Sequence, residues 1–412
     1  MNHESKEISP RMKELILVTA GFPFGMGETF LETEVKYLAE GFDKVNIIAI
    51  NPSSQTQRSL PKNCQATALQ INIGGKEKLK ALRYLFTELF WKEVKVIRSV
   101  YKKRLTKGVI NTMLISLYRA SKIKAELETQ VNKNDQTFYS YWCDDAALAS
   151  GLHKEKHQKI PAVCRTHGWD VYFEVHDLNY LPFRHFIAYQ LDAIYPISQK
   201  GKEYITEKWM VSNPEKVEVS RLGVAAQKKV NPSGTFTIVS CSNLIPLKRV
   251  ELIIEGLSNI TEHPINWTHF GDGDEKEHSI QLAKAKLGGN INWEFKGRVP
   301  NKEVMQWYRE NNPSLFINVS SSEGIPVSIM EAMSFGIPCI ATNVGGNSEI
   351  VNEQNGKLLA ENPTPQEIAD AICVFFDSTV FQSKSEGALL TWKEQYNGER
   401  NYSNFVGKLS IL

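Results

Sequence analysis

The sequence predicts an α/β protein made of two doubly wound, Rossmann-like domains. Its 412 residues exceed what one compact core usually holds, and strand patterns alternate with helix patterns along most of the chain. The alternation stops in a turn-rich stretch, 223–234, and restarts at the β-branched run 236–240. We therefore expect a domain boundary between residues 224 and 235.

The first domain is expected to cover residues 1–224. An apolar run at 15–19 leads into a Gly/Pro-rich loop, after which a helical pattern begins near Glu28 and a second apolar run follows. This order of strand, loop, helix and strand is typical of the start of a doubly wound sheet. The other strands expected in this domain are at 45–50, 138–141, 162–165 and 193–197.

The second domain is expected at residues 225–390. We expect residues 391–412 to form a C-terminal helix that packs back on the first domain. The strands expected in the second domain are at 236–240, 265–270, 291–295, 315–319 and 337–342.

Residues 75–130 are expected to form a helical insert of two or three helices without a strand. Apolar residues recur there at helical spacing, and residues 76–124 hold fourteen Lys or Arg against three Glu. The simpler interpretation is that the apolar stripe packs on the sheet and the lysines form a solvated face. The alternative is a basic surface that docks peripherally on a membrane.

The composition argues against several classes of protein. A net charge of +2 gives no case for nucleic acid, and six widely spaced cysteines without a C-x-x-C pair argue against a disulfide framework and a zinc site. The polar N-terminus lacks the apolar stretch of a secretory signal, and no window approaches ~18 consecutive apolar residues. We expect a cytoplasmic protein, either soluble or peripheral at the inner face of the plasma membrane.

A glycine pair, Gly25 and Gly27, follows the first predicted strand, as in dinucleotide-binding sheets. Phe30 occupies the third glycine position of that fingerprint, and the second strand ends without an acidic residue for a ribose. We therefore do not expect NAD binding.

The strongest chemical signal is the segment from Ser321 to Gly336. Glu323 lies in the loop after a predicted strand, where ligands bind in open α/β sheets, and Glu331 lies on the helix that follows. Pro326 suits the first turn of that helix, and Gly336 suits its end. The helix N-terminus between the two glutamates offers backbone N–H groups and a positive dipole end to a diphosphate or to sugar hydroxyls.

The segment from Glu323 to Gly336, together with the strand and the Gly345-Gly346 turn that follow, resembles the signature of glycosyltransferase family 4. The resemblance implies the GT-B fold, in which two Rossmann-like domains face each other across a cleft, and a retaining transfer from a nucleotide sugar. It implies that Glu323 contacts the donor sugar and that Glu331 binds the ribose hydroxyls. The donor-site residues that it implies between them are Gly324, Ile325, Pro326, Val327 and Ser328.

Two other parts of the second half resemble the same family. In the segment 240–249 the resemblance assigns Lys248 to the donor phosphates, while Asn243 stands where the family usually has an arginine. The segments 270–273 and 295–299 resemble the loops around the nucleotide base, which adds Gly273 and Arg298 to the implied donor site.

The first half contributes fewer implied site residues. The segment 165–170 resembles the family's His-Gly-x-Asp segment, whose histidine, here His167, lies close to the donor sugar. Arg165, Trp169 and Asp170 are interpreted equally well as structural supports of that histidine. The resemblance also implies that the glycine loop faces the acceptor and the transferred sugar, and its candidate residues are Gly25, Gly27 and Glu28.

The resemblance implies a hexosyltransferase with catalytic roles for His167, Lys248 and Glu323. In the mechanism that the resemblance implies, the acceptor attacks the front face of the sugar, and Lys248 and helix N–H groups stabilise charge on the leaving diphosphate. No Asp-x-Asp pair lies near a donor motif, since Asp272-Gly-Asp274 falls in the base-side loop, so neither a metal nor another cofactor is expected beside a UDP- or GDP-linked donor.

The expected acceptor is a glycan or a lipid-linked oligosaccharide in surface polysaccharide biosynthesis. Two alternatives stay open. One is a noncatalytic GT-B subunit that binds a nucleotide sugar and supports a partner transferase. The other is an epimerase that acts on the nucleotide sugar itself.

Overall fold

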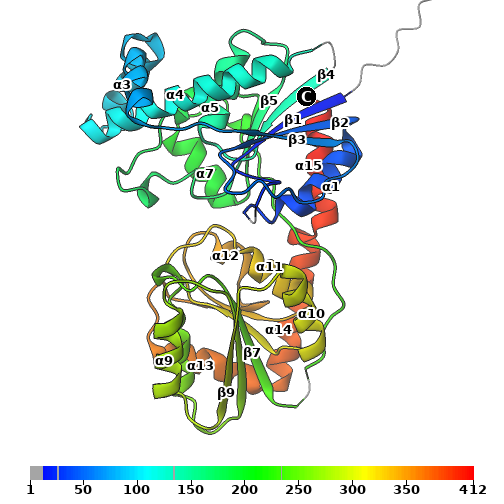
Figure 1. Cartoon of the computed structure of the whole chain (residues 1–412). Helices are drawn as coiled ribbons and strands as arrows, with labels where there is room; N and C mark the ends of the chain where they lie inside the picture. The colour runs from blue at the N-terminus through cyan, green and yellow to red at the C-terminus, as the bar shows by residue number, and fades with distance from the viewer. Residues whose placement is uncertain (1–12, 26, 133–134, 233) are drawn as a thin grey trace, which may run out of the picture. The chain divides into compact units, whose positions relative to one another are not determined.

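The computed structural model describes residues 13–25, 27–132, 135–232 and 234–412. The chain divides into two compact units (Figure 1). The N-terminal unit comprises Met1–Ser220 and a returning segment, Tyr402–Leu412, and the C-terminal unit comprises Arg221–Asn401. The division lies a few residues before the expected boundary, and the return to the first unit begins at Tyr402 rather than at residue 391.

The N-terminal unit is built on a sheet of six parallel strands. In spatial order these are β3 (Cys64–Leu69), β2 (Lys44–Ile50), β1 (Lys13–Thr19), β4 (Asp135–Ser140), β5 (Ala162–Thr166) and β6 (Ala193–Pro196). The helices around it are α1 (Leu31–Gly41), α2 (Gly75–Ala81), α3 (Glu88–Ser99), α4 (Lys107–Gln130), α5 (Asp145–Lys154), α6 (Arg184–Gln190) and α7 (Gln199–Lys208).

The C-terminal unit is built on a second sheet of six parallel strands. In spatial order these are β12 (Gly356–Leu359), β11 (Cys339–Thr342), β10 (Leu315–Asn318), β7 (Phe236–Cys241), β8 (Ile265–Phe270) and β9 (Ile291–Gly297). Its helices are α8 (Val250–Ser258), α9 (Lys276–Lys286), α10 (Asn301–Asn311), α11 (Val327–Ser334), α12 (Asn347–Ile350), α13 (Pro365–Cys373) and α14 (Ser378–Thr391). The α/β architecture with two doubly wound sheets is therefore confirmed.

The central strands of the first sheet are buried on both faces, as apolar runs in parallel sheets usually are. Ile16 and Val18 belong to the core under α4 and α5, whereas Leu15 and Leu17 belong to the core on the opposite face, because neighbouring strand residues point in opposite directions. The opposite face is covered by α1 and by the last helix, α15 (Gly398–Ser410), which contributes Phe405.

The helical insert consists of α2, a 3-10 turn η1 (Leu82–Phe86), α3 and α4. The buried side of α4 carries Met113, Leu117, Ala120, Ile123 and Leu127, which recur at intervals of three or four residues and pack into the core. The insert thus contributes to the core of the N-terminal unit with one side.

The sequence prediction missed two strands, β3 and β12. Each lies at the edge of its sheet. β3 has the sequence CQATAL, in which only Cys64 is buried, and β12 has four residues. Most side chains of β3 are not buried and β12 is short, so the apolar pattern that predicts a strand is weak in both.

Candidate functional site

The predicted donor residues of the C-terminal unit lie at the carboxyl ends of two neighbouring strands. The loop after β7 carries Asn243 and Lys248, and the loop after β10 carries Glu323. Because β7 and β10 are paired in the sheet, the two loops emerge side by side. This is the position at which open parallel sheets bind ligands.

Lys248 and Glu323, which the sequence places 75 residues apart, form an ion pair. Lys248 Nζ donates to Glu323 Oε1 at 2.6 Å, and the same oxygen accepts from Asn318 Nδ2 at 3.1 Å and from Ser320 Oγ at 2.7 Å. Both side chains are largely shielded from solvent. The carboxylate is thus fixed in position by three donors, and the ammonium group is held beside it.

Arg249 is a residue of this site that sequence reasoning missed. Its guanidinium donates to the carbonyl oxygens of Val319 (2.8 Å), Ser320 (2.9 Å) and Glu361 (2.8 Å). It therefore ties the loop after β7 to the loop that carries Glu323. The adjacent basic residue, Lys248, was the only signal in the sequence, and it does not distinguish a ligand-binding cation from a structural one.

The helix α11 begins at Val327, in the same loop as Glu323. No described side chain caps its N-terminus, so backbone N–H groups at Val327 and Ser328 have no side-chain acceptor. Pro326 occupies the N-cap position, one residue before the first turn in which we expected it. Gly336, with a φ of 72°, ends the helix as predicted.

The Gly345-Gly346 turn packs against the same loop. A Cβ on Gly345 would lie 1.7 Å from the Glu323 carbonyl oxygen, and one on Gly346 would lie 2.6 Å from the Gly324 carbonyl oxygen. The Gly346 N–H donates to the Gly324 carbonyl at 2.8 Å. Only glycines allow this close approach, so the turn packs directly against the loop that carries Glu323.

Glu331 lies further along α11, where its carboxylate accepts a hydrogen bond from Asn301 Nδ2 at 2.7 Å. Burial raises the pKa of this carboxyl to about 7, and the Asn301 hydrogen bond offsets only part of that rise. Glu331 also raises the pKa of Cys241, at the end of β7, where burial has the larger effect. The carboxylate is therefore close to the strand end from which Asn243 and Lys248 follow.

Asn243, Gly273 and Arg298 come together at neighbouring strand ends of the same sheet. Arg298 Nη2 donates to Asn243 Oδ1 at 3.4 Å. A Cβ on Gly273 would lie 2.2 Å from the carbonyl oxygen of Leu244, so the loop after β8 packs directly on the loop that carries Asn243. Arg298, which follows β9, thus brings a guanidinium to Asn243, the residue that stands where an arginine was expected.

The glycine loop of the N-terminal unit is held by Glu28. Its carboxylate accepts hydrogen bonds from the backbone N–H groups of Ala20 (3.1 Å), Gly21 (2.8 Å) and Phe22 (2.7 Å), and from Trp142 Nε1 (2.7 Å). These bonds turn Glu28 into a left-handed conformation with a φ of 51°, so α1 begins at Leu31 and not near Glu28 as predicted. A direct contact between Glu28 and a ligand stays a prediction.

Of the two glycines in this loop, the structure explains Gly25. Its φ of 72° lies in the left-handed region, and a Cβ there would lie 3.1 Å from Ser53 Oγ. A Cβ on Gly27 would meet no described atom within 4 Å, so nothing in the described chain requires a glycine there.

His167 lies at the carboxyl end of β5 in a cluster of aromatic rings. The ring centroids of Tyr141 and Trp142 are each 4.5 Å from that of His167, and the Phe30 centroid is 6.1 Å away. Neither ring nitrogen of His167 has a hydrogen-bond partner among the described residues. Burial, with a smaller effect of Arg165, holds the pKa of the ring well below its usual range, so the imidazole is neutral.

The neighbours of His167 have structural roles. Asp170 Oδ1 accepts from the His167 N–H at 2.7 Å, and its Oδ2 accepts from the Cys143 N–H at 2.9 Å, which joins the loops after β4 and β5. Arg165 is fully buried and donates to Tyr139 Oη at 3.0 Å. Trp169 is 60% exposed. The structure therefore assigns Arg165 and Asp170 the supporting role that the sequence left open.

A cavity of about 150 Å³ lies beside this cluster and was not foreseen. Trp142, Asp144 and Arg119 contribute to its walls. Burial, and to a smaller extent the neighbouring Asp145, raises the pKa of Asp144 to about 7. Asp144 is also the N-cap of α5, where it accepts a hydrogen bond from the Ala146 N–H at 2.8 Å. In the sequence it therefore looks like an ordinary N-cap residue, and nothing there points to the cavity.

The C-terminal part of the chain matches a known family. Residues 224–383 match the family model "Glycosyl transferases group 1". The amylovoran biosynthesis glycosyltransferase AmsK of Erwinia amylovora is 26% identical over 383 residues, which cover 86% of this chain and 89% of AmsK. The O-antigen biosynthesis glycosyltransferase WbnH of Escherichia coli is 26% identical over 214 residues, 52% of this chain and 59% of WbnH.

Some relatives are matched only in part. Protein CapJ of Staphylococcus aureus is 28% identical over 37% of this chain and 40% of CapJ, so the chain spans less than two thirds of CapJ and of WbnH. The crystal structure of Anabaena Alr3699/HepE in complex with UDP and glucose aligns with a TM-score of 0.65 at 16% identity, covering 97% of this chain and 100% of that chain. This likeness shows the fold, which is the GT-B fold.

The described residues contain no helix that combines the length and the apolar composition needed to cross a bilayer.

Proposed function

We propose that this protein is a retaining glycosyltransferase that moves a sugar from a nucleoside diphosphate to a hydroxyl of a glycan or lipid-linked acceptor in polysaccharide biosynthesis. The observation that carries the proposal is the Lys248–Glu323 ion pair, held at the carboxyl ends of β7 and β10, with Glu323 in the loop that leads into α11, whose N-terminus no described side chain caps. A diphosphate needs positive charge and N–H donors, which Lys248 and the start of α11 supply. A sugar needs a carboxylate that is fixed in position, which Glu323 supplies.

In the proposed reaction the protein stabilises charge on the leaving diphosphate. Lys248 and the N–H groups of α11 meet the oxygens whose negative charge grows as the glycosidic bond breaks. Arg298 supplies a second cation, because its guanidinium reaches Asn243 from the end of β9. With positive charge from side chains and backbone, transfer is proposed to proceed without a metal ion.

The carboxylates orient the donor. Glu323, fixed by Lys248, Asn318 and Ser320, accepts hydrogen bonds from sugar hydroxyls, and Glu331 accepts from the ribose hydroxyls. The acceptor oxygen attacks the same face that the diphosphate leaves, and the leaving phosphate takes the acceptor proton. The anomeric configuration is then retained without a covalent intermediate.

The N-terminal unit is proposed to receive the sugar and the acceptor. The His167 ring nitrogens, unpaired among the described residues, can bond sugar hydroxyls, and Tyr141 and Trp142 offer aromatic faces to apolar sugar C–H groups. The cavity beside Asp144 is the proposed place of the acceptor hydroxyl group. Since Alr3699/HepE is solved with UDP, UDP-sugars are the first donors to test, with GDP-sugars as the alternative.

A donor screen tests this proposal. The purified protein should be stabilised against thermal unfolding by one class of nucleotide sugar, because a ligand that binds only the folded state raises its apparent stability. The same donor should be turned over, with release of the nucleoside diphosphate. Binding of a nucleotide sugar with no turnover in the presence of any acceptor would favour a noncatalytic subunit instead.

The raised pKa of Glu331 gives the donor site a pH dependence. The ionised carboxylate accepts ribose hydroxyls, whereas the protonated form in the empty site begins to dominate below pH 7. Donor affinity is therefore expected to reach its full value as the pH rises well above 7 and to fall by up to about tenfold per unit below 7. A UDP-sugar is the suitable probe, since its diphosphate diester does not titrate between about pH 5.5 and 8.5.

Isothermal titration across this range measures the effect. The control is Glu331→Gln, which keeps the shape and loses the titration, and should bind weakly with a flat profile. An identical pH profile for the wild type and Glu331→Gln would contradict the assignment of Glu331.

The proposed membrane contact rests on an outward apolar stripe of the helical insert. Leu79 (70% exposed), Leu82 (44%) and Phe86 (89%) are spaced by three and four residues along α2 and η1, so they lie on one face. Ala81, on the opposite face, is buried in the core. Trp91 at the start of α3 is also exposed, and its Nε1 donates to the Leu85 carbonyl at 2.8 Å, which fixes its ring near the stripe.

Basic side chains flank the stripe. Lys76, Lys78, Lys80 and Arg83 are all exposed, and the only acidic residue on α2 and η1 is Glu77. Cations beside exposed apolar side chains suit an anionic bilayer surface, at which each Lys or Arg contributes about 1 kcal/mol. We propose that the insert docks there and brings the N-terminal unit to a lipid-linked acceptor.

Vesicle sedimentation tests the docking. The protein should bind vesicles that contain phosphatidylglycerol, fail to bind pure phosphatidylcholine, and dissociate at high salt because mobile ions screen exposed charges. Changing Lys76, Lys78 and Lys80 to Glu should abolish binding, and Phe86→Ser should weaken it. The control changes Lys284 and Lys393, two exposed lysines of the C-terminal unit, to Glu, and these changes should have little effect on binding. Absence of binding at low salt would rule out the docking surface.

A further inference from the structure

A cluster of three metal-ligating side chains lies in the N-terminal unit, outside the site described above. Glu128 is near the end of α4, His153 is on α5, and His157 is in the turn that follows α5. One ligand atom from each lies within 4.8 Å of the other two. Among the described residues this is the one group of three or more histidine, cysteine or acidic side chains with such spacing.

His153 is buried without a hydrogen-bond partner for one ring nitrogen. The residue is 1% exposed, and its Nε2 has no partner among the described residues. Its ring packs against Phe138, with centroids 4.7 Å apart. A buried polar atom without a partner is costly, so it indicates a ligand that the protein can bind at that atom.

His157 presents a second imidazole beside the first. Its backbone N–H donates to the His153 carbonyl at 3.1 Å, so the two residues keep helical i, i+4 geometry beyond the end of α5. Their rings stack with centroids 4.3 Å apart and planes 16° apart. His157 Nε2 lies 2.9 Å from Glu128 Oε2, which joins the histidine pair to α4.

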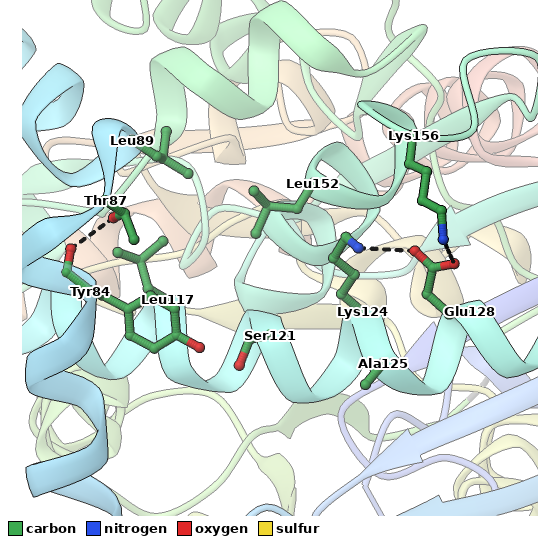
Figure 2. A pocket seen from close by; sticks show the side chains of 10 residues that line it. All are labelled: Tyr84, Thr87, Leu89, Leu117, Ser121, Lys124, Ala125, Glu128, Leu152 and Lys156. Carbon is green, nitrogen blue, oxygen red and sulfur yellow. Dashed lines mark hydrogen bonds and ion pairs between the residues drawn. The ribbon is translucent and has the colours of Figure 1, made fainter.

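Two lysines form ion pairs with the Glu128 carboxylate, so they would compete with a metal ion for it. Figure 2 shows Glu128 with Lys124 on one side and Lys156 on the other, and their ammonium groups lie 2.9 and 3.3 Å from its oxygens. Lys156 is 67% exposed, and ion pairs of such exposed side chains contribute little, so it can swing into solvent. Glu128 and Lys156 also line a cavity of about 650 Å³, which gives an ion a path to the cluster.

We propose that Glu128, His153 and His157 bind one Zn²⁺ ion. Two imidazole nitrogens and one carboxylate oxygen suit zinc, whereas Mg²⁺ and Ca²⁺ prefer oxygen ligands alone. Three protein ligands leave a fourth position for water. The ion joins α4 to α5 within the N-terminal unit. The spacing of the cysteines, which argued against a zinc site, bears only on a site built from cysteine.

Binding requires small local changes. Lys156 leaves Glu128, and His157 carries its proton on Nδ1 so that the Nε2 lone pair faces the ion. His153 likewise turns a lone pair toward it. The three ligand atoms then draw together from their present separations to those of a tetrahedral site.

Metal titration of the untagged full-length protein tests the site. Zn²⁺ should bind with a stoichiometry of one per chain and raise the unfolding temperature, and Co²⁺ should give the visible absorption of a tetrahedral ion. Glu128→Gln and His157→Gln change partly exposed side chains, so these variants should fold and lose at least tenfold in affinity. His278→Gln, an exposed histidine of the C-terminal unit, is the control and should bind as the wild type does.

One variant separates a metal site from a hydrogen-bonded ion-pair network. Lys156→Met removes a competitor for Glu128, so it should tighten zinc binding several-fold while it loosens the network. Zinc binding that is weaker in Lys156→Met, unchanged in His157→Gln, or absent in the wild type would overturn the proposal.

Discussion

Lys248→Ala is expected to lower kcat about 10²- to 10³-fold, the loss seen when one group that stabilises charge in a transition state is removed. The reason is twofold. The variant lacks the ammonium group that meets the leaving diphosphate, and Glu323 loses the donor held at 2.6 Å and faces the diphosphate with an unpaired charge. Free nucleoside carries no phosphate, so it should bind to the variant nearly as well as to the wild type. The main loss should be in kcat, because the charge that Lys248 meets grows in the transition state.

A matched control separates this effect from the loss of any lysine–glutamate pair. Lys286 pairs with Glu255 at 2.7 Å on the surface of the same unit, away from the strand ends that carry the site. Lys286→Ala should therefore keep wild-type kcat. If Lys248→Ala weakens nucleoside and nucleoside diphosphate equally and leaves kcat unchanged, Lys248 does not bind the donor phosphates.

Glu331→Ala is expected to weaken donor binding by roughly ten- to a hundredfold. A charge-assisted hydrogen bond contributes roughly 1.5–3 kcal/mol, and the ribose offers hydroxyls to this carboxylate. In contrast to Lys248→Ala, this change should weaken nucleoside and nucleoside diphosphate by a similar factor, because the contact is to the ribose. Calorimetric titration with uridine, UDP and a UDP-sugar measures the three affinities.

Two variants on α10 serve as controls for Glu331→Ala. Asn301→Ala removes the neutral donor to Glu331 and should change affinity by only a few-fold, since the carboxylate stays in place. Glu303→Ala removes an exposed carboxylate from the same helix and should have no effect. Unchanged affinity in Glu331→Ala for all three ligands would remove Glu331 from the site.

The sequence predicted that the candidate donor residues follow strands, and the structure places them at strand ends. Glu323 was expected in the loop after one strand, and the resemblance assigned Lys248 to the segment after another. Because β7 and β10 are neighbours in the sheet, the two side chains meet. Buried runs such as 15–19 were equally recognisable, because a strand covered on both faces is mostly apolar.

Other features depend on contacts that a one-dimensional pattern does not record. Glu28 looks like the first residue of a helix, but its carboxylate turns back to three loop amides, which delays α1 to Leu31. Arg249 directly follows the lysine assigned to the phosphates, but its guanidinium holds carbonyl oxygens of the neighbouring loop. His167 and the aromatic rings around it come from three separate strand ends, so their meeting follows from the sheet order and not from spacing in the chain.

The configuration of the product tests the central claim most directly. The protein is incubated with α-linked UDP-glucose, UDP-galactose, UDP-N-acetylglucosamine and GDP-mannose, with methanol as the acceptor hydroxyl, and the methyl glycoside is read by NMR. The account predicts a methyl α-glycoside from one donor, lost in Lys248→Ala and kept in Lys286→Ala. A β-glycoside would contradict retention, and the absence of any glycoside from a donor that binds would contradict catalysis at the Lys248–Glu323 site.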